Sequence, residues 1–448
     1  MPNPNCTGQQ ELDLGVIDFG RLGRRRVEGR FDGGSMTSDG GVMLLSAADR
    51  KLGLTAAAAR CIADPRNPLL ITHAVRDMLR QRVYGLALGW EDLNDHKALR
   101  RDVAMQTAVG VDREVASAPT LCRLEQWADR ATAVRLSELL VEQFIASFKQ
   151  APEELVLDFD ATDNPLHGQQ EGRFFHGYYD CYCYLPLYIF CGRHLLAARL
   201  CSSSVDAADG AREEVARIVA QIRERWPRTT IVIRADSGFC RDDLMSWCEE
   251  NNVKYVLGLA GNSRLGARLA PDMAVARAKA KRTGQPARVF ADFEYRTRRS
   301  WSAKRRVIGK AEWTKGEANP RFIVTNVHPA FGAARFLYES VYCQRGEMEN
   351  RLKECQGDLF ADRTPAPTMR ANQLRLWIAS FAYILMCAVR RIGLAGTKLE
   401  AATCGTIRIA LLKIGALVTV SVRRVKLAFA SACPGREVFM LAQRRLCG

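Results

Sequence analysis

Two apolar, β-branched runs that each end in an aspartate constrain the fold of this chain more than any other feature. One is LVLDFD, which ends at Asp160, and the other is TIVIRAD, which ends at Asp236. An amphipathic segment at about 210–225 lies between the two runs. A second one, at about 242–250, follows TIVIRAD, and another apolar run, VKYVLGLA, comes after it. Strands that alternate with helices of this length are typical of an α/β sheet with crossover connections. We therefore expect both aspartates at the carboxyl ends of strands, where such sheets bind ligands.

A third acidic residue, Glu349, lies far downstream in the charged helical stretch YCQRGEMENRLKE. Carboxylates that folding brings together suit Mg²⁺, which takes oxygen ligands and leaves positions open for phosphates. These residues predict metal-assisted attack on a phosphodiester. Asp158 and Asp163 compete with Asp160 for the first position. Asp158 and Asp160 share one strand face and only Asp160 lies beyond the apolar run, so we favour Asp160.

The charge balance indicates the partner. The chain has 448 residues, with 65 Lys or Arg against 49 Asp or Glu and a formal net charge of +16. A balance this basic favours nucleic acid before membrane, because Lys and Arg neutralise phosphates. A chain of this length also exceeds what one hydrophobic core usually holds, so we expect two or more domains.

Cysteine, histidine and apolar patterns exclude several classes of protein. The fifteen cysteines form no C-x-x-C pair, which leaves zinc and thioredoxin-type motifs unsupported. His167 and His176 have no paired spacing and are expected to contact phosphate or form structural hydrogen bonds. The start is polar and arginine-rich, unlike a signal peptide, and the longest apolar stretch, 377–389, is too short to span a bilayer. We expect a cytoplasmic protein with reduced thiols that enters no membrane.

Changes in pattern along the chain predict its domains. After a short irregular start, residues 1–150 place apolar residues at spacings of three and four, which predicts a helical N-terminal region. On so basic a chain this region is a candidate reader of DNA ends, and the alternative is that its helices only pack a core. Residues 151–261 predict the first part of an α/β core. Short strand-like runs predict a β-rich insertion at 262–335. The second part of the core follows at 336–395, and a basic helical C-terminal region at 396–448.

The predicted insertion is the most basic part of the chain. From Arg277 to Arg321 there are fourteen Lys or Arg against four Asp or Glu. Aromatic residues interleave with these cations and can stack extruded bases while the charges hold the backbone. The alternative is an ordinary solvated charged face. The predicted DNA-contacting residues here are Arg298, Arg299, Trp301, Lys304, Arg305, Arg306 and Trp313.

Short motifs surround the three acidic residues. D-x-T begins at Asp160, RADSGF contains Asp236, and Y-x2-R-x3-E runs from Tyr342 to Glu349. A longer phrase, LDFDATDNPLHGQQEGRFFHGYYD, begins at Leu157. Together these motifs resemble the DDE transposases of bacterial insertion sequences, and the long phrase is similar to the signature of one subgroup. The resemblance covers nearly the whole chain, through GLAGNSRL to MRANQLRLWIASFAYILM.

The resemblance implies an RNase H-like (ribonuclease H fold) core interrupted by a β-rich insertion between the second aspartate and the glutamate. It implies that Asp160, Asp236 and Glu349 are catalytic and bind two divalent ions, Mg²⁺ or Mn²⁺, in each active site. It also implies that Tyr342 and Arg345 lie near the cleaved phosphate.

One position departs from the related signature, which often has a lysine seven residues after the glutamate. This chain has Gln356 there. Lys353 stands one helical turn after Glu349 and is predicted to contact the phosphate instead.

The implied function is cut-and-paste transposition, with cleavage at terminal inverted repeats and strand transfer into target DNA. The implied partners are double-stranded DNA ends and target, bound by a homodimer at the nucleoid of a bacterial cytoplasm. If the reaction passes through a hairpin, Trp301 and Trp313 are the candidates for flipping a base. An inactive transposase-derived repressor is one alternative, against which the intact carboxylates argue. A structure-specific nuclease is another, but it needs neither a large basic insertion nor a helical N-terminal module.

Overall fold

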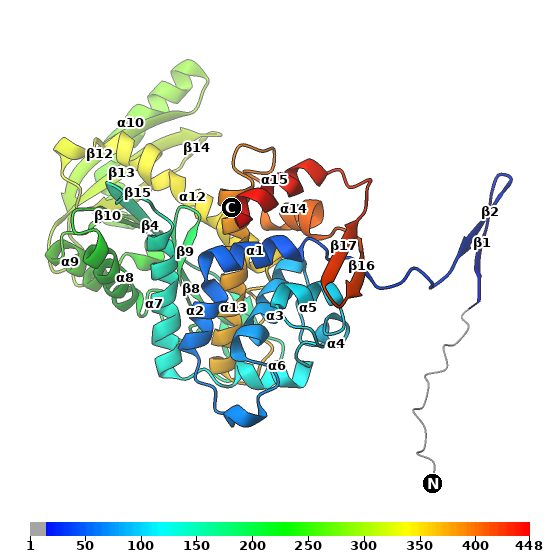
Figure 1. Ribbon diagram of the computed structural model, residues 1–448. Helices are drawn as coiled ribbons and strands as arrows, with labels where there is room; N and C mark the ends of the chain where they lie inside the picture. Colours follow the sequence, from blue (N-terminus) through cyan, green and yellow to red (C-terminus); the bar gives the residue numbers. More distant parts are fainter. Residues whose placement is uncertain (1–14) are drawn as a thin grey trace, which may run out of the picture.

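A nine-stranded mixed sheet packs beside a helical body (Figure 1). The computed structural model describes residues 15–448, so the first fourteen residues of the predicted N-terminal region lie outside the described part. The strands are β4 (Glu154–Ala161), β8 (Leu187–Cys191), β9 (His194–Arg199), β10 (Thr230–Ala235), β11 (Lys254–Leu259), β12 (Ala287–Tyr295), β13 (Arg305–Thr314), β14 (Glu317–Ala318) and β15 (Arg321–Thr325). Their order is β12-β13-β15-β11-β10-β4-β8-β9, and β14 pairs with β13. β10 is parallel to β4 and β11, whereas the other neighbours pair antiparallel.

Side chains of successive strand residues point to opposite faces of the sheet, and different helices cover the two faces. Leu157 and Ile233 face helices α7 (Arg130–Ala146), α8 (Ala211–Arg225), α9 (Asp242–Glu250) and α10 (Ser263–Thr283). On the opposite face, Val232 packs against Leu337 of a helical segment, 334–358, that includes α11 (Ala334–Phe336) and α12 (Gly346–Lys353). Since successive strand residues point to opposite faces, Asp158 and Asp160 belong to the face that this segment covers.

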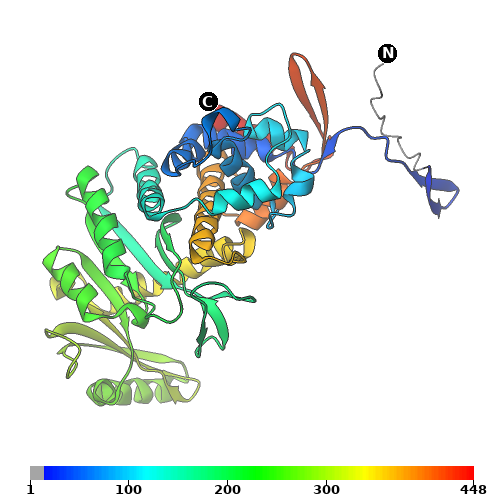
Figure 2. The same ribbon diagram turned by 90° about the horizontal axis from the view of Figure 1, so that it is seen from below.

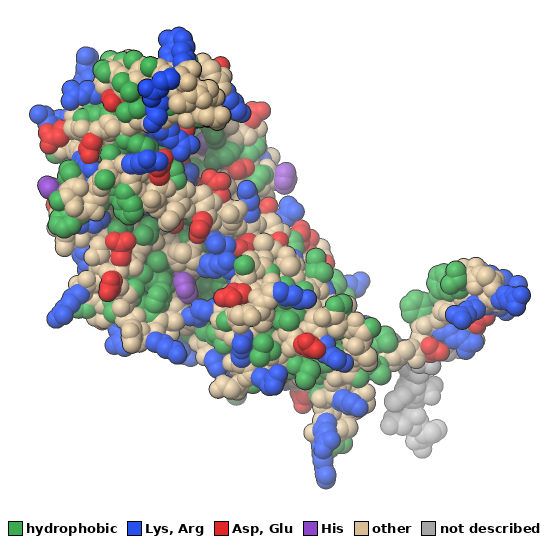
Figure 3. All heavy atoms as spheres, turned by 90° about the horizontal axis from the view of Figure 1, so that it is seen from above, with side chains coloured by type: hydrophobic (Ala, Val, Ile, Leu, Met, Phe, Trp, Pro, Cys, Tyr) green, Lys and Arg blue, Asp and Glu red, His purple; other side chains and the backbone are tan. Residues whose placement is uncertain are grey.

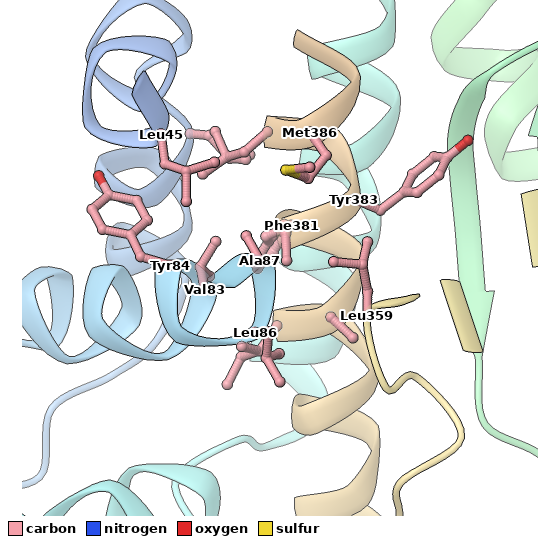
Figure 4. Packing of buried hydrophobic residues seen from close by; sticks show 14 of the residues in the cluster. Leu45, Val83, Tyr84, Leu86, Ala87, Leu359, Phe381, Tyr383 and Met386 are labelled. Atoms are coloured by element: carbon pink, nitrogen blue, oxygen red, sulfur yellow. The ribbon is translucent and has the colours of Figure 1, made fainter. Parts of the chain in front are cut away.

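Helices from both ends of the chain share one core around α13 (Met369–Ala388). Figure 4 shows Leu45 and Val83 from the N-terminal helices close to Met386 of α13. With its continuation to Gly393, α13 is the one helix of the described part that is long and apolar enough to cross a membrane, and 78% of its apolar window is buried inside the protein. The other helices of this body are α1 (Val42–Leu52), α2 (Leu54–Cys61), α3 (Val75–Leu88), α4 (His96–Leu99), α5 (Val103–Val109), α6 (Ala118–Glu125), α14 (Cys404–Ile407) and α15 (Arg436–Cys447).

Two segments form strands where the sequence patterns led us to expect none. Residues 17–29, which belong to the start expected to be irregular, form an exposed hairpin of β1 (Ile17–Leu22) and β2 (Arg25–Gly29). The region 396–448, predicted to be helical, contains a second hairpin of β16 (Ala416–Ser421) and β17 (Arg424–Phe429), and β16 also pairs with β3 (Met36–Thr37). The helical prediction for this part is wrong because valine recurs at every second position of ALVTVSV, a spacing typical of strands.

The stretch 262–335 also differs from its prediction as short strand-like runs joined by turns. It begins with α10, a helix of 21 residues that contains Pro271, a residue type that weakens a helical pattern in the sequence. Its strands β12, β13 and β15 extend the edge of the central sheet beyond β11. The division of the chain into domains at 151, 262, 336 and 396 stays a prediction.

The stability of this fold is expected to depend on pH through His194. Its ring lies 5.3 Å from that of Phe144 and 5.7 Å from that of Phe148, and burial, together with the charge of Arg391, lowers its pKa to about 4. An unfolded histidine has a pKa of about 6.5. The unfolded chain therefore binds the proton more tightly, and stability falls as the pH drops from about 6.5 towards 4, by at most about 3 kcal/mol.

Urea unfolding of wild type and His194→Phe at neutral and mildly acidic pH measures this contribution. We expect the variant to lose less stability on acidification than the wild type. His328→Gln is measured in the same way as a control, since it removes an exposed histidine elsewhere in the chain. Equal losses in His194→Phe and wild type would contradict the assignment.

Candidate active site

The ends of two parallel strands place Asp160 and Asp236 next to each other. In the register of β4 and β10, Phe159 pairs with Ala235, and the two aspartates are the residues that follow. Asp236 begins the turn after β10, where its Oδ1 accepts a hydrogen bond from the Gly238 backbone N–H at 2.8 Å, as aspartates at such turns commonly do. The predicted position of both aspartates at strand ends is confirmed.

Arg345 connects the third acidic residue to this strand edge. Its Nη1 lies 3.3 Å from Asp160 Oδ2, and its Nη2 lies 3.9 Å from Glu349 Oε1. Arg345 and Glu349 are four residues apart on segment 334–358, so they share one side of it. The Asp160 side chain is 15% exposed and that of Glu349 is 55% exposed. The structure thus brings Asp160 and Glu349 to one guanidinium group, and the neighbouring Asp236 interacts electrostatically with the same group.

The electrostatics of this edge favour a bound cation. Burial raises the pKa of Asp160 to about 6; the Arg345 charge opposes this rise, and the negative charges of Asp236 and Glu349 add to it. Burial alone would lower the pKa of Arg345, but the surrounding anions outweigh it and the pKa rises. The carboxylates are therefore only partly neutralised by the one arginine among them.

The donor set fits a divalent ion such as Mg²⁺, because carboxylate oxygens are its preferred protein ligands. Over residues 15–448, no three His, Cys, Asp or Glu side chains converge closely enough to hold a metal ion. Arg345 lies between Asp160 and Glu349. Since more than half of the Glu349 side chain is exposed, its rotamer can change without disturbing the core.

Tyr342 lies against the second aspartate because β11 has a glycine at this place. A Cβ atom on Gly258 would lie 2.6 Å from the Tyr342 hydroxyl and 3.0 Å from the carbonyl carbon of Asp236. Burial raises the pKa of Tyr342, with Arg345 opposing and Asp236 adding to the shift, so the hydroxyl stays protonated and can donate a hydrogen bond. Our sequence reasoning missed Gly258, although a glycine inside a strand often marks such a close approach.

Asp158, the competitor of Asp160, is held in a buried ion pair. Arg234 places Nε 2.5 Å from Asp158 Oδ1 and Nη2 2.8 Å from Oδ2, and its Nη1 donates to the Val341 carbonyl oxygen at 2.5 Å. The pair therefore attaches segment 334–358 to the sheet one residue before Tyr342. Sequence reasoning also missed Arg234. It could have been found from the sequence, because Arg234 lies two residues before Asp236 in RAD and therefore on the same strand face.

Gln356 has a structural role at the position where related signatures often have lysine. Its Nε2 donates to the Asp163 carbonyl oxygen at 3.2 Å and to Asn164 Oδ1 at 3.1 Å, which ties the end of segment 334–358 to the loop after β4. Lys353 is exposed on α12 and, with Asn350, lines a surface hollow of about 400 Å³. Its predicted phosphate contact stays a prediction.

The predicted DNA-contacting residues of the basic segment have different surroundings. Arg298, Arg299 and Lys304 are exposed in the loop between β12 and β13. Trp301 is only 4% exposed and packs edge-to-face on Tyr295, with ring centroids 5.8 Å apart. In this conformation its ring offers no free face to a base.

The remaining residues of this set take part in folding contacts. Arg305 forms ion pairs with Asp242 at 2.6 Å and Glu249 at 2.7 Å. Arg306 pairs with Asp292 at 2.6 Å. Trp313 is half-buried, and the guanidinium of Arg277 lies 5.0 Å from its ring centroid. Charge counts along the sequence cannot separate such internally paired cations from those that face solvent.

Comparison with known protein families gives a match over nearly the whole chain. A family model described as Transposase DDE domain group 1 matches residues 19–447. The match spans the sheet, the helical body and all three acidic residues around Arg345. No curated protein matches the chain.

Proposed function

Because this chain belongs to the transposase DDE domain group 1 family and so acts in DNA transposition, we propose that it moves an insertion sequence by cut and paste. It cleaves DNA at the terminal inverted repeats and transfers the freed strand into target DNA. The observation that supports this best is the edge where β4 and β10 end, where Asp236 lies beside Asp160 and where Arg345 pairs with both Asp160 and Glu349.

We assign an RNase H-like core to strands β9-β8-β4-β10-β11. The first three form an antiparallel meander, and β10 then lies parallel to both β4 and β11. This topology supports the assignment. Helix α10 with strands β12, β13 and β15 is the proposed insertion, since it lies in the chain between Asp236 and Glu349.

Asp160, Asp236 and Glu349 would hold two divalent ions, Mg²⁺ or Mn²⁺, which activate the attacking oxygen and stabilise the leaving one. In the first step a water oxygen bonds to phosphorus at the element end and the bond to the 3′ oxygen breaks. One proton of the water is released to solvent and the leaving 3′ oxygen takes up a proton, so the products are a 3′-hydroxyl and a 5′-phosphate. In the second step that hydroxyl gives its proton to solvent while its oxygen bonds to a target phosphorus. The target's own 3′ oxygen is displaced and takes up a proton.

The remaining residues of the site bind the phosphate rather than react. Arg345 can donate two parallel hydrogen bonds to phosphate oxygens, a geometry that suits guanidinium. The protonated Tyr342 hydroxyl can donate a further one. Lys353 would reach a neighbouring phosphate from the exposed side of α12, and Arg298, Arg299 and Lys304 would hold DNA farther along the sheet.

We further propose that two copies pair the two element ends at the bacterial nucleoid and that the helical body reads the end sequence. Because α1 to α6 share their core with α13, deletion of residues 1–150 would remove part of that core. End reading is therefore better tested with substitutions of exposed residues on these helices than with a truncated chain.

The first experiment is incubation of the full chain with a labelled duplex that carries the flanking inverted repeat, in Mg²⁺, Mn²⁺ or EDTA. Cutting at the repeat boundary only with metal is the expected result. Binding without cutting in any metal would favour the inactive repressor, and cutting that ignores the repeat would favour a nuclease.

A further inference from the structure

The β16–β17 hairpin stands out from the helical body as an arm. Its base is anchored, because Ala416 and Val418 are buried, β16 pairs with β3, and the rings of Phe429 and Phe439 lie 5.2 Å apart. Beyond this base, Figure 2 shows the hairpin, in orange-red, clear of the helices. A strand of six residues is about 20 Å long, so the tip lies well outside the body.

The tip combines positive charge with exposed apolar side chains. Residues 416–429 contain Arg423, Arg424 and Lys426 and no acidic residue. Val420 is 60% exposed, and Val422 is fully exposed. Figure 3 shows Lys and Arg side chains gathered on the tip that projects at the lower edge of the molecule. A partner for this tip must offer negative charge beside a less polar surface, which describes the phosphates and the base edges of a DNA groove.

The turn itself is not built from residues that favour turns. Ser421 pairs with Arg424, which leaves Val422 and Arg423 as the two loop residues. Loops of this length usually carry Asn-Gly or Asp-Gly. A β-branched residue here neither favours the turn nor joins a core, and positions that break local folding rules are often functional.

We propose that this arm enters a groove of double-stranded DNA, with Val422 against the base edges and with Arg423, Arg424 and Lys426 on the flanking phosphates. A two-stranded ribbon fits the major groove, which is about 12 Å wide. The inference rests on the proposed function because it takes DNA as the partner. It concerns an element carried by the helical body, outside the strand edge where the carboxylates meet.

Equilibrium binding of a mixed-sequence duplex tests the arm without depending on cleavage. All proteins carry Asp160→Asn and are measured in EDTA over a range of salt. Arg423→Gln/Arg424→Gln should weaken binding about tenfold or more and reduce the salt slope by about 2, at about 0.9 for each phosphate contact. Val422→Ser should weaken binding several-fold with an unchanged slope, because it removes an apolar contact and no charge.

The matched control is Arg225→Gln/Arg228→Gln, which removes the same charge from exposed residues near the start of β10, at the edge opposite the carboxylates. It should bind almost as the parent protein does. All three variants should keep the parent's melting temperature, because their side chains are exposed.

Arm variants that bind like the parent overturn the inference, and so does an equal loss in the control, which would mean that net charge alone matters. A change of oligomeric state, seen by light scattering, with unchanged DNA affinity would assign the arm to a second copy of this chain and overturn it too. If the parent binds no duplex at all, the proposed function fails as well. If the wild type cuts the repeat and the arm variants bind normally, only this inference fails.

Discussion

Alanine in place of Asp160, Asp236 or Glu349 is expected to reduce cleavage of the element end by about a thousandfold or more while DNA binding persists. Each variant would lack one carboxylate ligand of the two ions on which both chemical steps depend. The phosphate-binding cations remain in place, so affinity should change little. Single-turnover cleavage and equilibrium binding of the same labelled duplex measure the two effects separately.

Glu224→Ala provides the matched control, because Glu224 is an exposed carboxylate on α8, away from the strand edge. It should cleave at the wild-type rate. A variant at one of the three positions that still cuts would remove that residue from the metal-binding set. Loss of binding and of cutting together would instead indicate a folding defect, which the melting temperature of the variant would reveal.

The second large effect is expected at Arg234, where Arg234→Met should lower the free energy of unfolding by about 3 to 5 kcal/mol. The substitution leaves Asp158 buried without its cation; the two side chains are only 8% and 6% exposed in the intact pair. Urea unfolding measures the loss. Arg212→Met tests a surface ion pair for comparison, and about 1 kcal/mol or less is expected there.

Replacement of both partners separates stability from positioning. Asp158→Leu/Arg234→Met should recover most of the lost stability, since no buried charge remains unpaired. It should still cleave slowly, because the hydrogen bond from Arg234 to the Val341 carbonyl oxygen is gone and segment 334–358 is held less firmly against the sheet next to Tyr342. Wild-type cleavage by this double variant would show that the Val341 contact does not position Tyr342 and Arg345.

The parts of the fold that the sequence predicts well are those set by local spacing. The runs that end in Asp160 and Asp236 form strands because their apolar residues are continuous and β-branched, and parallel neighbours then place the two ends together. The helices α8 and α9 follow from their apolar periodicity in the same way.

The features that sequence reasoning missed depend on contacts between distant segments. The two ion pairs of Arg305 join β13 to α9, so its side chain stabilises the fold although its neighbours in the sequence suggest a DNA contact. The burial of Trp301 and the closeness of Gly258 to Tyr342 likewise depend on how elements meet. The spacing of residues along the chain does not indicate which distant segments come into contact.

The sharing of one core by both ends of the chain has a consequence for synthesis on the ribosome. Helices α1 to α6 emerge first, but the α13 surface on which they pack is made only near the end of translation. A product that stops before Met369 would expose the apolar side of its N-terminal helices and would not form the helical body. Truncated copies of this gene should therefore be removed as misfolded chains instead of persisting as competitors for the element ends.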